Sequence, residues 1–350
     1  MKIEVDNHKL MYHPERVAEW KEKGDCPPVY VEIGPTNRCN HECMFCALDY
    51  LEHGGADIDS KILTKNLENM AKQGVKSVMF AGEGEPFLHK DTPLFIKTAK
   101  ENGMDVSVTS NGVPFTNKKA EQCMPYLSWI RFSVDAGTSK TYAEVHGTKK
   151  EDFEKVLNNI KYAVDVKRKN NLNTTIGVQA LLTNKSLDEL ILLANTVKEI
   201  GVDNLQIKPY SHHPASKNDL SFDYNEAEKL RKPLESLNDE KFQTIYRTQT
   251  IKRLSQEREY KDCYGLSFFT LIDSSGNVVP CNLFYNNQKF TYGNLYEKNF
   301  SDIWASEKRK EIIQKIKKRG VDDCRVGCRL DVGNRYLERL KNPHPHDNFI

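Results

Sequence analysis

Three cysteines fall within eight residues near the start of the chain, spaced Cys-x3-Cys-x2-Cys. They are Cys39, Cys43 and Cys46, in the segment from Gly34 to Leu48. Thiolates are soft ligands that suit iron–sulfur clusters or zinc, and this spacing lets one loop surround a single metal centre. A four-iron cluster takes four ligands, so three cysteines leave one iron open to another ligand. A zinc site completed by His41 is an alternative.

A second group of cysteines lies late in the chain. It consists of Cys263, Cys281, Cys324 and Cys328, which leaves Cys26 and Cys123 outside both groups. A reducing compartment keeps thiols free, so nine cysteines in a cytoplasmic chain argue against disulfides and for two metal centres. An isolated cysteine is most often a small buried hydrophobic residue, although a thiol that faces a pocket could donate a hydrogen atom to a substrate radical.

Charge and hydropathy exclude several classes of partner. The 350 residues include 51 basic and 49 acidic side chains, with a formal net charge of +2, so composition predicts no nucleic-acid partner. No apolar run approaches the roughly 20 residues of a membrane-spanning helix, which predicts no membrane insertion. The first residues, MKIEVDNHKLMYHPERV, lack the apolar core of a signal peptide. We therefore expect a cytoplasmic protein.

Strand and helix patterns alternate through the first two thirds of the chain. The expected strands are 29–33, 76–81, 104–109, 129–134, 175–182 and 204–208, and the expected helices are 60–73, 91–102, 117–125, 151–169 and 187–200. Spacings of about 25 to 45 residues are typical of parallel strands joined by helical crossovers. Six units are fewer than the eight of a closed TIM barrel, so we predict an α/β fold with an open, partial (β/α)6 TIM-like barrel.

The alternation ends near residue 212. We expect a helix over 224–237, a strand over 242–251, a hairpin over 268–279 and a helix over 301–318, followed by a basic, histidine-containing tail. The predicted domains are a lead-in (1–28), the barrel (29–222) and a small α+β cluster domain (223–350). Ligands of such barrels bind at the carboxyl ends of the strands, where the first cysteine loop is expected.

The cysteine loop that follows the first strand of this β-α series resembles the radical S-adenosylmethionine (SAM) superfamily. The resemblance implies that Cys39, Cys43 and Cys46 hold three irons of a 4Fe–4S cluster, and that the amine and carboxylate of SAM chelate the fourth. One electron from the cluster would cleave SAM to methionine and a 5′-deoxyadenosyl radical, which abstracts a substrate hydrogen. The resemblance also implies an electron donor of the flavodoxin or ferredoxin type.

Further segments agree with this resemblance. Gly82-Glu83-Gly84-Glu85-Pro86 follows the second strand and is similar to the Gly-Gly-Glu-Pro segment that pairs with the SAM amino group. Gly84 and Glu85 match that segment, whereas Glu83 replaces a glycine and could face the substrate. The other implied SAM contacts lie at the ends of the third and fourth strands and beside the last cysteine of the loop: Ser110, Asn111, Ser133, Asp135 and Phe45.

Polar side chains after the later strands are candidates for the substrate site. With Glu83, the candidate catalytic residues are Gln179, Lys208, Tyr210 and His212. Such groups could bind a polyhydroxylated or anionic substrate and carry protons, and an ordinary solvated loop is an equal alternative. His146 lies where many relatives carry a basic residue near the SAM carboxylate.

The late cysteines resemble the SPASM/twitch extension of radical SAM enzymes. Cys263-x12-Gly276-x4-Cys281 is similar to its opening, and Cys324-x3-Cys328 adds two thiolates. Four cysteines can fully ligate one auxiliary 4Fe–4S cluster. The longer SPASM form uses about seven cysteines, so the resemblance favours the twitch form with one auxiliary cluster. A four-cysteine zinc ribbon is the alternative.

These features together predict a radical SAM oxidoreductase. A fully ligated auxiliary cluster cannot bind substrate without losing a cysteine, so its expected role is to accept an electron. The leading hypothesis is oxidation (dehydrogenation) or epimerisation of a carbohydrate- or aminocyclitol-like small molecule, because twitch enzymes of the aminocyclitol-dehydrogenase type look like this. The alternative is a SPASM-type maturase that modifies a ribosomally synthesised peptide.

A remote alternative is a non-catalytic metal-binding module, for instance one that binds RNA through the basic segment 308–318. Ile312, Ile313 and Ile316 punctuate that segment at helical spacing. An amphipathic helix with a solvated basic face is therefore the better interpretation.

Overall fold

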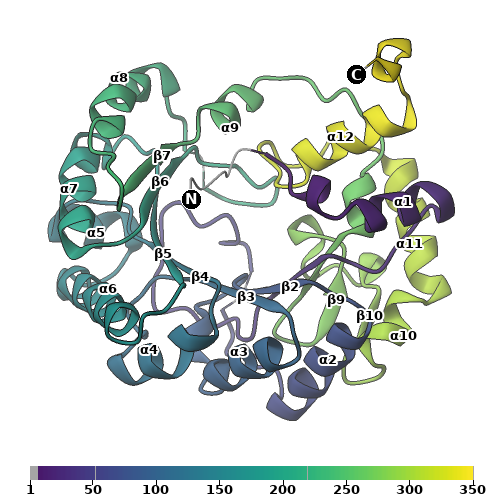
Figure 1. Ribbon diagram of the computed structural model, residues 1–350, viewed down its shortest axis with the longest axis horizontal. Coiled ribbons are helices and arrows are strands. Elements are labelled where there is room, and N and C mark those ends of the chain that lie inside the picture. Colours follow the sequence, from purple (N-terminus) through teal and green to yellow (C-terminus); the bar gives the residue numbers. More distant parts are fainter. Residues whose placement is uncertain (1–6, 52, 219, 350) are drawn as a thin grey trace.

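A single curved sheet organises the chain. The computed structural model describes residues 7–51, 53–218 and 220–349. Within them, ten strands form one sheet in the order β10-β9-β8-β1-β2-β3-β4-β5-β6-β7. Figure 1 shows the strands as an arc with helices along its outer side. The strands are β1 (Tyr30–Ile33), β2 (Ser77–Phe80), β3 (Asp105–Ser110), β4 (Trp129–Ser133), β5 (Thr175–Leu181), β6 (Asn204–Lys208), β7 (Gln243–Tyr246), β8 (Phe269–Ile272), β9 (Asn277–Val279) and β10 (Gly293–Asn294).

The six predicted strands are present, and they pair in parallel and in chain order. The crossovers contain α2 (Ser60–Lys72), α3 (Thr92–Glu101), α4 (Asn117–Cys123), α5 (Ser139–His146), α6 (Glu151–Lys169) and α7 (Leu190–Ile200). Alternate strand residues, such as Ile130 and Phe132 of β4, are fully buried in the core between sheet and helices. Their neighbours, including Arg131, therefore face the inner side of the arc, because side chains alternate along a strand. The predicted partial TIM-like barrel is confirmed.

The parallel part of the sheet extends beyond the six predicted strands. Helix α8 (Tyr224–Glu235) leads to β7, which pairs with β6 in parallel. The strand expected over 242–251 ends at Tyr246, and α9 (Thr248–Arg253) follows it. The predicted boundary between 222 and 223 stays a prediction, and it falls just before a helix and a strand that continue the barrel.

The predicted hairpin joins the small domain to the barrel. Strands β8 and β9 pair antiparallel, and β8 also pairs in parallel with β1. The helix expected over 301–318 is divided into α10 (Phe300–Trp304) and α11 (Glu307–Arg319), because the Ser306 hydroxyl accepts from the Arg309 amide and starts a new helix. Ile312 and Ile316 are buried, as the amphipathic interpretation of this segment requires.

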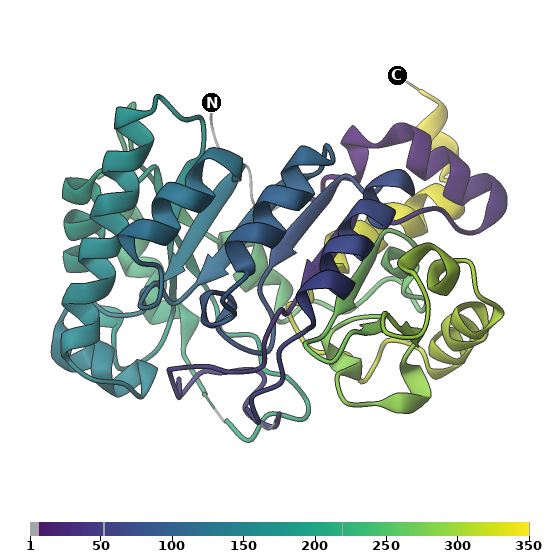
Figure 2. The same ribbon diagram turned by 90° about the horizontal axis from the view of Figure 1, so that it is seen from below.

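The predicted lead-in and tail each contain a helix that the sequence analysis did not anticipate. Helices α1 (Pro14–Lys23) and α12 (Asp331–Lys341) lie side by side in both ribbon views (Figures 1 and 2). Trp20 of α1 and Leu337 of α12 share a small buried cluster. Residues 1–6 of the lead-in lie outside the described residues. None of the described helices combines the length and apolar composition needed to cross a membrane.

Candidate active site at the carboxyl ends of the strands

The first cysteine loop leaves β1 and is held on both sides before it reaches Cys39. The Arg38 carbonyl accepts from the Glu85 amide at 2.8 Å. The Arg38 guanidinium forms an ion pair with Asp57 at 2.7 Å and donates to the Leu88 carbonyl at 2.8 Å. These contacts fix the loop over the end of β2, which is the side of the sheet on which the predicted SAM residues lie.

Helix α5 fixes the second half of the loop. The amides of Glu42 and Met44 donate to the carbonyls of His146 and Val145 at 3.1 and 3.0 Å. The Phe45 ring packs edge-on against the His146 ring, with centroids 5.3 Å apart. Nδ1 of His146 lies 3.4 Å from the Cys43 sulfur. The buried His146 ring lies between this cysteine and Asp135, and its expected place near the SAM carboxylate stays a prediction.

The three thiols are partly buried and close enough to one another for their charges to interact. Burial raises the pKa of Cys39 to about 11 and raises the pKa of Cys46, and it moves the pKa of Cys43 well above its usual range. The neighbouring thiolates add to the shifts of Cys39 and Cys43. Metal ligation requires thiolates, so a cationic metal centre would offset what burial and repulsion oppose. This donor set fits an iron–sulfur cluster.

His41 lies beside Cys43 as a neutral base. Ligand atoms of His41, Cys43 and His146 all lie within 4.8 Å of one another. Burial, and then the neighbouring His146, lower the pKa of His41 to about 3. Within the described residues, neither ring nitrogen of His41 has a hydrogen-bond partner. The imidazole is therefore held uncharged behind the cysteine loop.

Glu85 joins the ends of β2 and β3 beneath the loop. Its buried carboxylate accepts from the Ser110 hydroxyl at 2.8 Å and from the amides of Asn111 and Phe87 at 2.7 and 3.0 Å. Burial raises its pKa to about 6, although these hydrogen bonds act in the opposite direction. Asn111 also donates to the Asn40 side chain at 2.8 Å. Glu85, Ser110 and Asn111 thus meet next to the cysteine loop.

Gly84 is in tight contact with the backbone of the loop. A Cβ atom at this position would lie 2.4 Å from the Arg38 carbonyl oxygen and 2.6 Å from that of Thr36. No side chain fits at such a distance, so glycine is required for the close approach of the two segments. This is a physical reason for a glycine at the position that matches the SAM-binding segment.

Glu83 turns away from this cluster and toward the small domain. Its Oε1 accepts from the Ser274 amide at 2.6 Å, in the turn between β8 and β9. Burial raises the pKa of the Glu83 carboxyl. The described contact is therefore structural, and it links the segment after β2 to the hairpin of the cluster domain.

The two residues expected at the end of β4 differ in their contacts. Asp135 is buried, accepts from the Leu181 amide at 2.5 Å, and has its Oδ2 3.3 Å from Nε2 of His146. Ser133 is half-buried and in register with Gln179 of β5. Asp135 therefore supports the His146 ring and the neighbouring strand, and Ser133 faces the inner side of the arc.

The four late cysteines converge from three places in the small domain. Cys263 precedes the 3-10 turn Tyr264–Ser267 before β8, Cys281 follows β9, and Cys324 and Cys328 lie in the loop between α11 and α12. Burial raises the pKa of Cys263 to about 12 and that of Cys281 well above its usual range. Repulsion from the other thiolates adds to both shifts. Four converging, half-buried thiols fit a fully ligated metal cluster.

Arg258 and Asn334 hold this second group in place. Arg258 donates to the carbonyls of Val321, Cys324 and Arg325 at 2.7, 2.9 and 2.9 Å. The Asn334 amide lies 3.5 Å from the Cys263 sulfur, and its oxygen accepts from the Gly265 amide at 2.7 Å. Helix α12, which the sequence analysis missed, therefore supports the late cysteines directly.

Tyr50 connects the two cysteine groups. It lies four residues after Cys46, and its hydroxyl donates to the carbonyl of Asn282, the residue next to Cys281, at 3.2 Å. Its ring stacks on His213, with centroids 4.8 Å apart. The neighbouring Leu48 and Leu51 pack against β8 and β9. The structure thus places the first loop against the second cysteine group.

Two of the substrate candidates lie on the inner side of the arc. Gln179 of β5 and Lys208 of β6 share that face, as does Arg131 of β4, which the sequence analysis did not select. Tyr210 is buried, whereas His212 is exposed with its ring 6.3 Å from that of Tyr210. The alternation of buried residues in β4 was the available signal for Arg131.

The surroundings of the two isolated cysteines indicate a structural role. Cys26 lies in the cluster between α1 and α12, and Cys123 is fully buried in the core of the barrel. Burial raises the pKa of both thiols to about 12. Neither thiol faces the inner side of the arc, so their surroundings do not support hydrogen-atom donation to a substrate.

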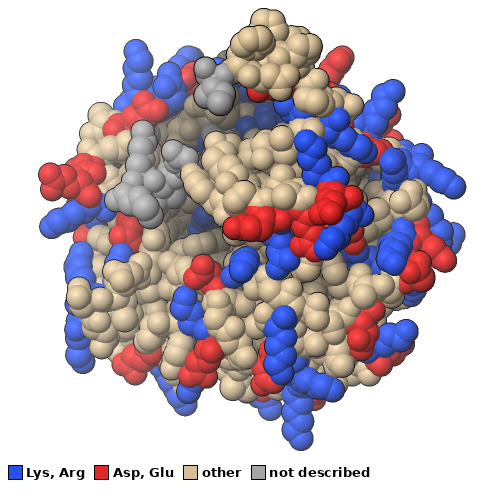
Figure 3. Space-filling model, turned by 45° about the vertical axis from the view of Figure 1, so that its right-hand side comes forward, with Lys and Arg blue, Asp and Glu red and all other residues tan. Residues whose placement is uncertain are grey.

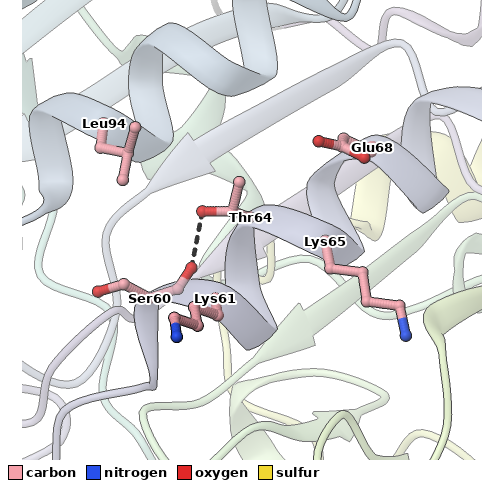
Figure 4. Close-up of a pocket in the computed structure, with 6 residues that line it drawn as sticks. All are labelled: Ser60, Lys61, Thr64, Lys65, Glu68 and Leu94. Atoms are coloured by element: carbon pink, nitrogen blue, oxygen red, sulfur yellow. Dashed lines mark hydrogen bonds between the residues drawn. The ribbon is translucent and has the colours of Figure 1, made fainter.

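A depression on the outside of the barrel is separate from these groups. It has a volume of about 370 Å³ and is lined by residues of α2 and by Leu94 of α3. Figure 4 shows its lining side chains, among them Thr64, whose hydroxyl donates to the Ser60 carbonyl at 2.6 Å. It contains no cysteine or histidine. The candidate site is on the inner side of the arc.

Comparison with known families agrees with this geometry. Residues 33–194 match the radical SAM superfamily, and residues 263–329 match the SPASM iron–sulfur cluster-binding domain. The two ranges cover more than half of the chain and include all seven clustered cysteines. The chain belongs to the radical SAM superfamily. Radical SAM proteins use SAM and a 4Fe–4S cluster, and the SPASM domain binds additional iron–sulfur clusters.

Named relatives include proteins with different substrates. A tungsten-containing aldehyde ferredoxin oxidoreductase cofactor-modifying protein of Pyrococcus furiosus is 25% identical over 303 residues, covering 80% of this chain and 81% of the relative. A probable GTP 3′,8-cyclase of Methanocaldococcus jannaschii is 28% identical over 176 residues, covering 49% of this chain and 55% of the relative.

Solved structures share the fold. Streptococcus suis SuiB, bound to S-adenosylmethionine, has a TM-score of 0.66 at 20% identity, covering 87% of this chain and 72% of SuiB. The protein anSMEcpe, with bound AdoMet, has a TM-score of 0.58 at 17% identity, covering 91% of this chain and 100% of its own. At such identities the likeness concerns the fold alone.

Proposed function

We propose that this radical SAM enzyme oxidises a carbohydrate- or aminocyclitol-like small molecule at a carbinol carbon. Cys39, Cys43 and Cys46 would hold the SAM-binding cluster, and the four late cysteines would hold one auxiliary cluster. Bound SAM and the first cluster supply the 5′-deoxyadenosyl radical that abstracts a hydrogen atom. The convergence of four half-buried late thiols beside the first loop is the observation that carries this proposal.

The positions of the residues around the first loop support a SAM site there. Gly84 allows the segment after β2 to touch the loop, and Glu85 ties that segment to Ser110 and Asn111. The Glu85 carboxylate already accepts three hydrogen bonds from the protein. Its proposed contribution is therefore to set the shape of the SAM site, while nearby backbone groups bind the methionyl end. Ser133 and the backbone of Phe45 complete the proposed set.

The overall oxidation balances with one electron acceptor. Transfer of the carbinol hydrogen atom to the 5′-deoxyadenosyl radical leaves a substrate radical. Loss of the hydroxyl proton to water and of one electron then gives the ketone. Four cysteines would fill every protein-ligand position of one 4Fe–4S cluster, which would suit an electron acceptor better than a substrate ligand. The Tyr50 hydroxyl donates to the residue next to Cys281, and this contact would give the electron a route between the two cysteine groups.

The small-molecule substrate has support from one relative. The Pyrococcus furiosus protein is named for modifying a cofactor, and it aligns with 80% of this chain. Gln179 and Lys208 on the inner side of the barrel add polar groups of the kind that bind such molecules. A ferredoxin- or flavodoxin-type donor is the proposed source of the first electron.

Isotope transfer tests the proposal. The anaerobically reconstituted enzyme would be incubated with SAM, a reductant, and a panel of carbinol-deuterated carbohydrates and aminocyclitols. We expect deuterium in 5′-deoxyadenosine and a ketone product from at least one member. Transfer from a backbone-deuterated peptide, with none from the carbohydrate panel, would contradict the proposal and favour the peptide maturase.

A further inference from the structure

The inner side of the barrel gathers positive charge. Lys208 of β6 lies close enough to Arg131 of β4 and to Arg325 of the late cysteine loop for their charges to repel its own. We refer to these three side chains as the cationic group. All three are half-buried, and in Figure 3 blue surface is visible inside the recesses of the face shown as well as at its edges.

Arg131 and Lys208 lie on the same face of the sheet, on the two strands that flank β5, and one loop adds Arg325. Arg131 is in register with Gly177 of β5, and Lys208 with Leu181 of the same strand. Arg325 donates to the Ser211 hydroxyl and carbonyl at 3.0 and 2.6 Å, three residues beyond Lys208. The late cysteine loop is thus fastened to the end of β6, with its arginine beside the lysine.

No carboxylate neutralises the cationic group within the described residues. The Arg131 guanidinium lies over the Trp129 ring at 4.7 Å, and Arg325 contacts only neutral oxygens by hydrogen bonding. Nearby Arg329 is paired with Glu32, and Arg247 has an interaction of its own, so the cationic group does not include them. Burial lowers the pKa of Lys208 to about 7, and the positive charges of Arg131 and then of the other nearby arginines add to this shift.

The late thiolates Cys328 and Cys281 offset part of the Arg325 charge, and the remaining positive charge favours a bound anion. Like charges that are partly removed from water repel one another strongly, and they are retained where a ligand of opposite charge compensates them. The carboxylate of SAM supplies one negative charge, which is fewer than three cations require. A phosphate monoester carries about −1.5 to −2 near neutral pH and offers three acceptor oxygens.

We propose that Arg131, Lys208 and Arg325 bind a phosphate group of the substrate, which makes the substrate a phosphorylated small molecule. This inference rests on the proposed function, because it names the substrate class of the same site. Arg131 lies two residues before the proposed SAM contact Ser133, Lys208 ends β6, and Arg325 follows the proposed auxiliary ligand Cys324. A phosphate held there would place the rest of the molecule toward the first cysteine loop.

Phosphate binding can be measured without turnover. Inorganic phosphate would be titrated calorimetrically into the reconstituted enzyme saturated with SAM, and into the variants Lys208→Gln, Lys208→Arg and Lys65→Gln. Lys65 lies on the exposed outer surface of α2 and is the matched control. Removing a repelled cation relieves strain in the fold, so Lys208→Gln is expected to fold and to melt at or above the wild-type temperature.

The proposal predicts that the wild type binds phosphate. Lys208→Gln should weaken this binding about tenfold or more, whereas Lys208→Arg and Lys65→Gln should largely retain it. SAM affinity should stay within about twofold in all variants, because the substituted side chains are not among the proposed SAM contacts and separate sites contribute independently. Absence of phosphate binding, equal loss in the Lys65→Gln control, or a parallel loss of SAM affinity in Lys208→Gln would overturn it. A wild type that binds phosphate but never cleaves SAM would instead refute the proposed function.

Discussion

Replacement of Gly84 by alanine should displace the first cysteine loop. The added Cβ would lie 2.4 Å from the Arg38 carbonyl oxygen and 2.8 Å from the Asn37 carbonyl carbon. Ordinary contacts of a Cβ atom begin near 3.4 Å, so one backbone must move by roughly 1 Å. The Glu85 amide, which donates to Arg38 at 2.8 Å, would lose that hydrogen bond as the segments separate.

Two effects of different size follow from this displacement. Overpacking of this kind costs about 1–3 kcal/mol of stability, which a chain of this size tolerates. Cys39 is bonded directly to Arg38, so the same shift moves a cluster ligand, and a misplacement of about 1 Å in a reacting geometry costs on the order of 10²-fold in rate. We expect Gly84→Ala to fold, and to lose SAM cleavage about a hundredfold or to lose the first cluster.

The assay is 5′-deoxyadenosine formation under reducing, anaerobic conditions, together with iron content and the melting temperature. Gly54→Ala is the matched control, because a Cβ at Gly54, which lies in the same connection between β1 and α2, would meet nothing within 4 Å. The reasoning fails if Gly84→Ala retains full iron content and wild-type SAM cleavage, or if Gly54→Ala is equally impaired.

Three further predictions concern the auxiliary cysteines and the two glutamates after β2. Cys281→Ser should retain SAM cleavage while product formation falls at least about tenfold, and equal loss of both would assign the late cluster a structural role. Burial raises the pKa of Glu85 from 4.5 to about 6, so its ionisation removes stability as the pH rises through that window. The melting temperature of Glu85→Gln should therefore fall less than that of the wild type between pH 4.5 and 6, and equal slopes would contradict this account. Glu83→Ala leaves the Ser274 amide without its acceptor, which should cost about 1–3 kcal/mol of stability and speed iron loss from the auxiliary cluster, whereas an unchanged melting temperature would show that this contact is unimportant.

The strand and helix pattern was predictable because burial imposes it locally. Val31 and Ile33, or Ile130 and Phe132, alternate with polar neighbours, and the crossover helices carry an apolar face. Helices α1 and α12 were missed because each buries few apolar side chains, and these meet in one small cluster from opposite ends of the chain. The continuation of the parallel sheet into β7 was not predictable from the local pattern, because only the pairing of β7 with β6 reveals it.

The candidate site was predictable where it depends on adjacent residues in sequence. The cysteine spacings and the segment from Gly82 to Pro86 can be read directly. Contacts that arise from tertiary packing could not be predicted from the sequence. Examples are the contact of His146 Nδ1 with Cys43 and the hydrogen bond from the Ser274 amide to Glu83. The cationic group was also hidden, because its members come from positions 131, 208 and 325, and each one alone resembles an ordinary polar residue of a strand or loop.

The division of labour between the two cysteine groups is the central claim, and one comparison tests it most directly. Iron content and SAM cleavage would be measured in the reconstituted wild type and in the variant Cys39→Ala/Cys43→Ala/Cys46→Ala. We predict about eight irons per chain and SAM cleavage in the wild type, and about four irons with no cleavage in the variant. Persistent SAM cleavage in the variant, or a wild type that binds zinc in place of iron, would contradict the account.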